Sequence, residues 1–141
     1  MADDNAIRIL LVEDNPIDAR ATLRAAKKLE LSNSIDHVVD GDEAIDYLTS
    51  GDNRRPDLVL LDLNLPGRDG HDVLAVMKQD ENLRRIPVCI LTTSANDADV
   101  LGAYDLGANA YVNKPITLEG WQEVVSQIEG FWLSLVRLPP S

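Results

Sequence analysis

The chain has 141 residues, with 24 acidic and 13 basic side chains and a formal net charge of −11 at pH 7. A chain of this length predicts one domain that buries a complete core, and its single cysteine, Cys89, excludes an intrachain disulfide. The acidic surface repels nucleic-acid phosphates and anionic lipids, which argues against both as partners. No signal sequence or membrane-spanning apolar run is present, so we expect a cytoplasmic protein.

Short aliphatic runs alternate with helical segments along the chain. Strands are expected at residues 7–12, 35–39, 57–61, 86–91 and 108–112. The first helix is expected to begin at Pro16, with Ile17, Ala21, Ala25 and Leu29 along one side. Further helices are expected at residues 42–50, 71–79 and 96–106, and after an N-cap at Thr117.

This alternation predicts an α/β fold, in which a parallel sheet carries helices on both faces. In such folds the ligand site lies beyond the carboxyl ends of the strands. The residues that follow the predicted strands are therefore the candidates for function.

Polar side chains stand at four of these strand ends. Glu13 and Asp14 follow the first strand, Asp62 the third, Thr92 ends the fourth and Lys114 follows the fifth. Three carboxylates at one edge repel each other unless a cation relieves them, and Mg²⁺ is the cation that suits oxygen ligands beside phosphate. Asp62 could then act as a nucleophile toward phosphorus, with the ammonium of Lys114 and the hydroxyl of Thr92 on the phosphoryl oxygens.

Each of these residues also has an ordinary structural explanation. Asp14 could cap the next helix, Asp62 could belong to a turn, Thr92 and Thr93 could be strand-end hydroxyls, and Lys114 could be a solvated loop charge. The joint pattern favours the functional interpretation, because four separate strand ends each supply a group that one reaction needs.

The ordered set of motifs resembles the receiver domain of response regulators in two-component signalling. The matching segments are residues 12–15, 40–44, 57–67 with 69–70, 91–93 and 113–115. The resemblance covers about residues 7–130 and implies a flavodoxin-like (βα)5 fold, with a doubly wound five-stranded parallel sheet in the strand order 2-1-3-4-5. We expect residues 131–141 to form an apolar extension of the same single domain, with no effector domain after it.

The resemblance also implies roles for single residues. Asp62 is then the phosphoacceptor, and Mg²⁺ is held by Glu13, Asp14, Asp62 and the backbone carbonyl of Asn64. The donor is a partner histidine kinase rather than His37 or His71 of this chain, for which we expect structural roles.

A second set of roles concerns the phosphoryl group and the switch. Thr92, Thr93 and Lys114 are expected to bind the phosphoryl oxygens, and the Lys114–Pro115 bond is expected to be cis. Tyr111 matches the switch aromatic, whose movement would reshape the face formed by the fourth helix, fifth strand and fifth helix. Asn64 and Ser94 border the site and are expected to influence the lifetime of the phosphoryl group.

The C-terminal segment is the most apolar part of the chain outside the core. Phe131, Trp132 and Leu133, with Trp121 in the preceding helix, predict the interface of a homodimer, and the alternative is that the tail folds back onto its own domain. This ending resembles that of the small dimeric receivers that partner bacterial phytochrome-type histidine kinases. It implies such a kinase as the phosphodonor.

Three other functions remain open from the sequence. A flavodoxin is disfavoured because Glu13 and Asp14 would repel a flavin phosphate. An aspartate-nucleophile phosphatase is disfavoured because such enzymes resemble one another in an Asp-x-Asp motif at the first strand, whereas Asp62 follows the third strand. We therefore expect a signalling protein rather than an enzyme. A receiver that acts only as an unphosphorylated scaffold is disfavoured by the complete acceptor, metal and lysine set. Cys89, inside a predicted strand, is expected to be a small core residue.

Overall fold

The computed structural model describes residues 7–29, 35–52 and 54–140 and contains the predicted parallel sheet. Its strands pair in the order β2-β1-β3-β4-β5, which confirms the order implied by the family resemblance. The bounds are β1 (Ile9–Val12), β2 (Ile35–Val38), β3 (Leu58–Leu61), β4 (Val88–Thr92) and β5 (Ala110–Asn113). Each strand overlaps the aliphatic run that predicted it.

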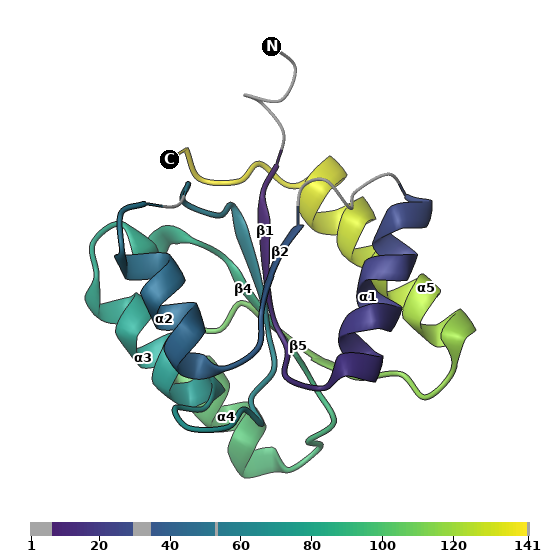
Figure 1. The fold of residues 1–141 in the computed structure, drawn as a ribbon, viewed down its shortest axis with the longest axis horizontal. Coiled ribbons are helices and arrows are strands. Elements are labelled where there is room, and N and C mark those ends of the chain that lie inside the picture. The colour runs from purple at the N-terminus through teal and green to yellow at the C-terminus, as the bar shows by residue number, and fades with distance from the viewer. Residues whose placement is uncertain (1–6, 30–34, 53, 141) are drawn as a thin grey trace.

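Helices cover both faces of the sheet, as a doubly wound fold requires. Figure 1 shows the sheet nearly edge-on, with α1 and α5 on one side and α2, α3 and α4 on the other. The helices are α1 (Pro16–Lys28), α2 (Gly41–Thr49), α3 (Gly70–Gln79), α4 (Asp97–Asp105) and α5 (Leu118–Ile128), with a short 3-10 helix η3 (Leu83–Arg85) and a π-helix η4 (Glu129–Leu135). Among the described residues, no helix is long and apolar enough to cross a membrane.

Polar N-caps fix where each long helix begins. The side-chain oxygen of each cap accepts a backbone N–H of the first turn, and this satisfies donors that have no partner inside the helix. The caps are Asn15, Asp40, Asp69, Asn96 and Thr117. Thr117 is the cap that the sequence predicted, whereas Asn15, not Asp14, caps α1.

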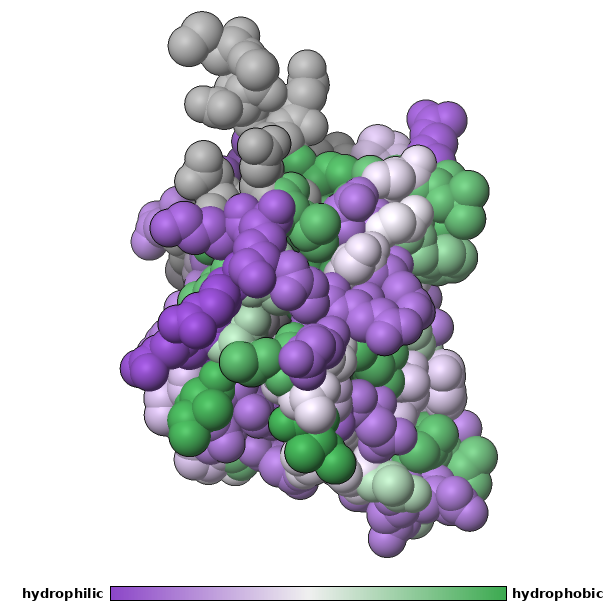
Figure 2. Space-filling model, turned by 90° about the vertical axis from the view of Figure 1, so that its right-hand side faces the viewer, coloured by the Kyte–Doolittle hydropathy of each residue, from purple (hydrophilic) through white to green (hydrophobic). Residues whose placement is uncertain are grey.

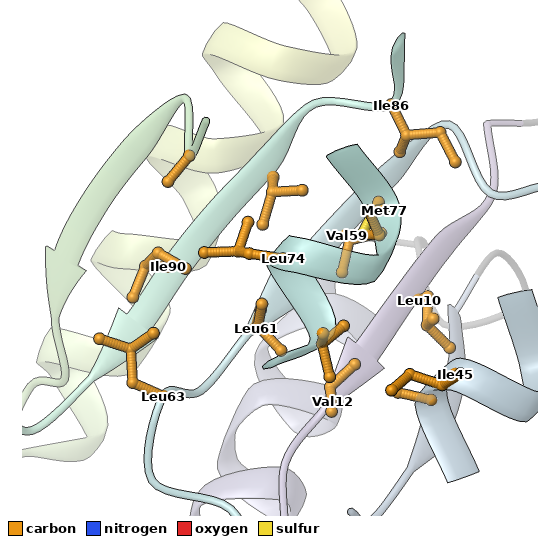
Figure 3. Close-up of a cluster of buried hydrophobic side chains, with 14 of the residues drawn as sticks. Leu10, Val12, Ile45, Val59, Leu61, Leu63, Leu74, Met77, Ile86 and Ile90 are labelled. Carbon is orange, nitrogen blue, oxygen red and sulfur yellow. The ribbon is translucent and has the colours of Figure 1, made fainter. Parts of the chain in front are cut away.

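Alternate residues of the strands face two separate cores. Leu10, Val12 and Val59 belong to the core shared with α2 and α3, where Figure 3 shows Ile45, Leu74 and Met77 pointing toward the strands. The intervening residues face α5, in a core of Ile9, Leu11, Leu58, Leu60, Cys89 and Ile128. Cys89 is thus a buried core thiol, and burial raises its pKa to about 12.

The buried side of α1 differs from the stripe expected from its sequence. Ile17 is 74% exposed, and the buried positions of the helix are Ala19, Thr22, Ala25 and Ala26. Small side chains allow α1 to pack closely against α5, where Ala25 and Ala26 contact Val125. The four-residue spacing alone could not distinguish this narrow alanine face from the larger side chains beside it.

The described residues contain no cis peptide bond, so the Lys114–Pro115 bond is trans. The expected cis isomer is therefore wrong for this structure. Trans is the isomer that bonds before proline favour by about 0.5–1 kcal/mol when the fold does not impose the other one.

The tail both packs on its own domain and leaves apolar groups in solvent. Trp132 and Leu133 contact the core beneath α5. Phe131 is 48% exposed and Leu135 is 74% exposed. Beyond η4 the chain crosses the amino-terminal edge of the sheet (Figure 1). Pro140 and Tyr47 line the same pocket.

Candidate functional site

Neighbouring strands bring four polar side chains to one edge of the sheet. Because β1, β3, β4 and β5 are adjacent and parallel, their carboxyl ends lie together. Glu13 follows β1, Asp62 follows β3, Thr92 ends β4 and Lys114 follows β5. Glu13, Asp62 and Thr92 are all buried, so the protein holds them in fixed positions rather than in solvent.

The ammonium group of Lys114 lies at the centre of this cluster. Its Nζ is 2.8 Å from Glu13 Oε1, 2.8 Å from Asp62 Oδ2 and 2.9 Å from Asp18 Oδ2. An ammonium carries three protons, so each carboxylate can accept one of them. The side chain of Lys114 is only 4% exposed, and its backbone N–H donates to the carbonyl of Thr92 at 2.8 Å.

Burial and ion pairing shift the pKa values of this cluster. Burial raises the pKa of Glu13 to about 7, although the hydrogen bond and charge of Lys114 act to lower it. Burial alone would lower the pKa of Lys114, but hydrogen bonds to Asp62, Glu13 and Asp18 outweigh it and the pKa is raised. Lys114 is therefore a cation at neutral pH. Glu13 needs a further cation nearby to be fully ionised there.

Asp62 is enclosed by hydrogen-bond donors. The backbone N–H of Asn64 donates to Asp62 Oδ1 at 3.0 Å, while Asp62 Oδ2 accepts from Lys114. The side-chain amide of Asn64 contacts the hydroxyl of the buried Thr92 at 3.4 Å. A Cβ atom at Gly70 would overlap the backbone carbonyl of Asp62, so glycine is required where α3 begins against the site.

Three carboxylates are close enough to share one metal ion. Oxygen atoms of Glu13, Asp14 and Asp62 lie within 4.8 Å of one another. Glu13 and Asp62 are buried and Asp14 is exposed, so the group combines fixed ligands with access for water. All donors are oxygen, and burial raises the pKa of Glu13 even with the ammonium of Lys114 beside it. The donor set therefore fits a hard divalent cation.

A hydrogen-bond network connects the end of β4 to β5 and α4. The hydroxyl of the half-buried Tyr111 donates to the carbonyl of Ser94 at 2.9 Å, and the amide of Asn113 donates to the same oxygen at 2.8 Å. The hydroxyl of Ser94 donates to Asp99 Oδ2 in the first turn of α4 at 2.6 Å. Ser94 is two residues beyond Thr92, so a shift at the site can reach α4 through these bonds.

Some predicted residues lie outside the cluster. Thr93 is exposed beyond the end of β4. Trp121, expected at a dimer interface, is only 5% exposed and is buried within its own chain. His71 is half-buried on α3, and a ring nitrogen of His37 lies 2.8 Å from the backbone carbonyl of Glu13. Because a carbonyl only accepts, this nitrogen of His37 is the donor.

Sequence reasoning missed one member of the cluster, Asp18. This residue lies in the first turn of α1 and is 96 positions from Lys114 along the chain. An acidic residue in a first helical turn is common because it favours the positive end of the helix dipole. Only the orientation of α1 above β5 reveals its contact with Lys114.

The chain is similar to known proteins over most of its length. Residues 9–126 match the model of the response regulator receiver domain. The chain is 43% identical over 134 residues to the probable methanogenesis regulatory protein FilR2 of Methanothrix harundinacea, covering 93% of this chain and 86% of FilR2. It is 42% identical over 135 residues to the response regulator Rcp1 of Synechocystis, covering 93% of this chain and 92% of Rcp1.

Solved structures of similar proteins extend this comparison. The phosphorylated cyanobacterial phytochrome response regulator RcpA superimposes with a TM-score of 0.89 at 43% identity, covering 95% of this chain and 99% of RcpA. The Mn²⁺-bound form of Rcp1 superimposes with a TM-score of 0.86 at 41% identity, with the same coverage of 95% and 99%.

Proposed function

The chain belongs to the response regulator receiver family, and on that premise we propose that Asp62 is the residue that accepts the phosphoryl group. The observation that carries this proposal is the environment of its carboxylate. Asp62 is buried at a strand end, 2.8 Å from the ammonium of Lys114 and beside the hydroxyl-bearing Thr92. Glu13 is also buried, paired with Lys114 and bonded to a backbone N–H at 3.2 Å, but Asp62 follows the central strand β3, between the carboxylates that follow β1 and the hydroxyl of Thr92 that ends β4.

In the proposed reaction a carboxylate oxygen of Asp62 attacks the phosphorus of a phosphohistidine on the kinase. The oxygen–phosphorus bond forms, the bond from phosphorus to the imidazole nitrogen breaks, and the nitrogen keeps the electron pair and takes a proton from solvent. Lys114 and Thr92 provide a positive charge and a donor for the phosphoryl oxygens. Because the group stays bound to Asp62, the chain acts as an acceptor and signalling protein rather than as an enzyme.

We assign the metal site to Glu13, Asp14 and Asp62, with the backbone carbonyl of Asn64 as a further ligand, and propose Mg²⁺ as the ion. When bound, Mg²⁺ would neutralise charge on the phosphoryl oxygens. The Mn²⁺-bound form of the similar Rcp1 supports the binding of a divalent ion by this chain. What the chain itself supplies to metal binding is the three carboxylates, whose oxygen atoms lie within 4.8 Å of one another.

The proposed switch runs from Asp62 through Thr92 to the Ser94 network. A phosphoryl group at Asp62 would draw the hydroxyl of Thr92 toward it and move the β4–α4 connection. Tyr111 would move with this connection, because its hydroxyl donates a hydrogen bond to the carbonyl of Ser94. The network continues into α4, where Leu101 and Tyr104 are exposed and available to an output partner.

A histidine kinase of the phytochrome type is the proposed phosphodonor, and we propose the cytoplasm as the location of the reaction. RcpA is described as a phytochrome response regulator, and its similarity to this chain supports the assignment. FilR2 is described as a probable methanogenesis regulatory protein, so a kinase of another class is the alternative donor. Phosphotransfer from each class of kinase would distinguish the two. The net charge of −11 argues against a nucleic-acid partner.

The exposed side chains beside the site indicate where the kinase would dock. Ile17, Ile116 and Leu118 are 74%, 100% and 66% exposed and follow the carboxyl ends of β1 and β5. Figure 2 looks onto the face of α1 and α5, and its lower end shows such apolar groups among polar ones. Arg20 and Arg24 line the same groove as Ile17 and Leu118 in an otherwise acidic chain. A kinase helix with an apolar centre and acidic flanks is complementary to this surface.

We further propose that the tail forms a homodimer. Phe131 and Leu135 are exposed on η4, and Phe131 lines a small pocket together with Val112, Ile128 and Trp132. Trp132 and Leu133 would support the interface while packing on their own core. The buried Trp121 would shape α5 rather than contact the partner. A two-fold interface along the tail is the simplest closed arrangement of identical chains.

Intact-protein mass spectrometry after incubation with acetyl phosphate and Mg²⁺ tests the acceptor proposal. We expect the wild type to gain one phosphoryl group and Asp62→Asn to gain none, while both remain folded. Asp46→Asn, which changes an exposed carboxylate on α2, is the matched control and should behave as wild type. If the wild type gains nothing from acetyl phosphate or from a phosphorylated kinase, the chain is a receiver-fold scaffold instead.

A further inference from the structure

We propose that Asp18 is a positioning residue, which holds the ammonium of Lys114 in place before and after phosphorylation. This inference rests on the proposed function, because the reaction that it serves is the one at Asp62. Its basis is the three-way ion pair of Lys114, in which Asp18 Oδ2 lies 2.9 Å from Nζ. Asp18 would act through Lys114 and not by contact with the phosphoryl group.

The backbone of Asp18 is firmly anchored in α1. Its N–H donates to the side chain of Asn15 at 3.1 Å. Its carbonyl accepts the hydroxyl of the buried Thr22 at 2.8 Å. Both bonds lie within the first turns of a helix that packs along α5. A carboxylate on such a rigid element can fix the position of a flexible lysine side chain.

The other two partners of Lys114 change their role during the proposed reaction. Asp62 gives up its negative charge to the phosphoryl group, and Glu13 is a proposed metal ligand. Asp18 does not belong to the group of carboxylates that lie within 4.8 Å of one another. Its ion pair with Lys114 can therefore persist when the other two are altered, and the ammonium stays beside the phosphoryl oxygens.

Without the Asp18 carboxylate, the ammonium would be shared by Glu13 and Asp62 alone. Those are the oxygens that the metal ion and the phosphorus must reach, so a tighter hold by Lys114 would compete with both. Loss of Asp18 should thus slow acceptance of the phosphoryl group. If Asp18 acted only through its charge on the incoming phosphate, its loss would instead speed acceptance, because removing a negative charge reduces the repulsion of the phosphate.

A double-mutant cycle separates these two effects. The rate of phosphoryl gain from acetyl phosphate at saturating Mg²⁺ is measured by intact mass for wild type, Asp18→Asn, Lys114→Met and the double variant. We expect Asp18→Asn to slow acceptance about three- to tenfold when Lys114 is present and not to slow it in the Lys114→Met background. Glu119→Gln, which removes an acidic charge from the first turn of α5, is the control and should leave the rate unchanged.

The Mg²⁺ dissociation constant of the four unphosphorylated proteins gives a second readout, for use if Lys114→Met accepts too slowly to measure. Asp18→Asn should raise this constant more in the presence of Lys114 than in its absence. An equal effect of Asp18→Asn in both backgrounds, no effect, or faster acceptance with Lys114 present would overturn the proposal. A wild type that gains no phosphoryl group would refute the proposed function instead, while the Mg²⁺ measurements would still decide whether Asp18 acts through Lys114.

Discussion

The two ends of the sheet in this protein are built by different physical rules. At the carboxyl ends of the strands, buried charges meet in fixed geometry, and the ammonium of Lys114 touches three carboxylates. At the opposite edge and along η4, contacts are apolar and incomplete, and Phe131 and Leu135 face solvent. The charged groups of the first region are paired within the chain, whereas the second region leaves apolar side chains in solvent.

This difference indicates which functions the fold determines alone. The strand order places Glu13, Asp62 and Lys114 together whatever the partner, so the chemistry is a property of the single chain. The function of the exposed apolar residues in the tail depends instead on the surface that binds them. The two regions should therefore respond independently to substitution, and the following experiments test that independence.

The largest effect on stability is expected from removing the central cation. Lys114→Met leaves the buried carboxylates of Glu13 and Asp62 without their partner, and should lower the free energy of unfolding by about 3 kcal/mol in the absence of metal. Added Mg²⁺ should restore part of this loss, because it supplies positive charge to the same oxygens. Chemical denaturation with and without Mg²⁺ measures both effects. Lys78→Met is the control, because Lys78 donates to the backbone carbonyl of Arg84 rather than to a carboxylate. An equal loss in the two variants would contradict the assigned role of Lys114.

The next effect concerns the tail alone. The double substitution Phe131→Ser with Leu135→Ser removes exposed apolar surface, and should weaken dimerisation by about ten- to a hundredfold. Sedimentation at several concentrations measures the change, and phosphoryl gain at Asp62 should be unaltered. Point substitutions suit this test better than truncation after Glu129, because truncation would also remove Trp132 and Leu133 from the core. Dimers of unchanged affinity would exclude this surface as the interface.

Metal binding should depend on pH through Glu13. Its raised pKa of about 7 means that metal binding must displace a proton below neutrality. The affinity for Mg²⁺ should therefore fall as pH falls, by about tenfold between pH 8 and pH 6. Calorimetry in buffers of different ionisation enthalpy measures both the affinity and the protons released. Glu13→Gln should bind more weakly and show a flatter profile, whereas a wild-type affinity that stays constant over this range would contradict the metal assignment of Glu13.

The smallest effect is expected at the docking surface beside the site. Ile116 is fully exposed, so Ile116→Ser should leave stability and the reaction with acetyl phosphate unchanged. It should slow transfer from a phosphorylated kinase by about fivefold, because it removes apolar contact at a partner surface. Leu135→Ser provides the converse control, with an effect on dimerisation and none on transfer. Slower reaction with acetyl phosphate in Ile116→Ser would show that Ile116 affects the reaction at Asp62 itself and not only the docking of the kinase.

The sequence predicted the site more accurately than its surroundings. Glu13, Asp62 and Lys114 could be placed together because alternating strands and helices require a parallel sheet whose carboxyl ends coincide. The contact of Asp18 with Lys114 could not be placed, because it depends on how α1 is oriented over a strand 96 positions away. The exposure of Ile17 was missed for a related reason, since hydrophobic spacing does not show that α1 buries alanines instead.

Helix α5 and the tail show a further limit of sequence-based prediction. Trp121 and Trp132 stand at the same helical spacing, yet Trp121 is buried and Trp132 only partly so. The change from α5 to the π-helix η4 alters the side that each residue presents, and composition does not reveal such a change. The fold-back alternative holds in part, because Trp132 and Leu133 pack on the core of their own domain. The dimer interface stays a prediction, which the exposure of Phe131 and Leu135 supports.

The most direct test of the central claim is to locate the phosphoryl group on the chain. After reaction with acetyl phosphate and Mg²⁺, reduction with borohydride converts an aspartyl phosphate to homoserine, and peptide mass spectrometry identifies its position. We predict homoserine at position 62 and at no other aspartate. Homoserine at Asp14 or Asp18, or a phosphorylated protein in which Asp62 remains intact, would contradict the assignment of Asp62 as the phosphoacceptor.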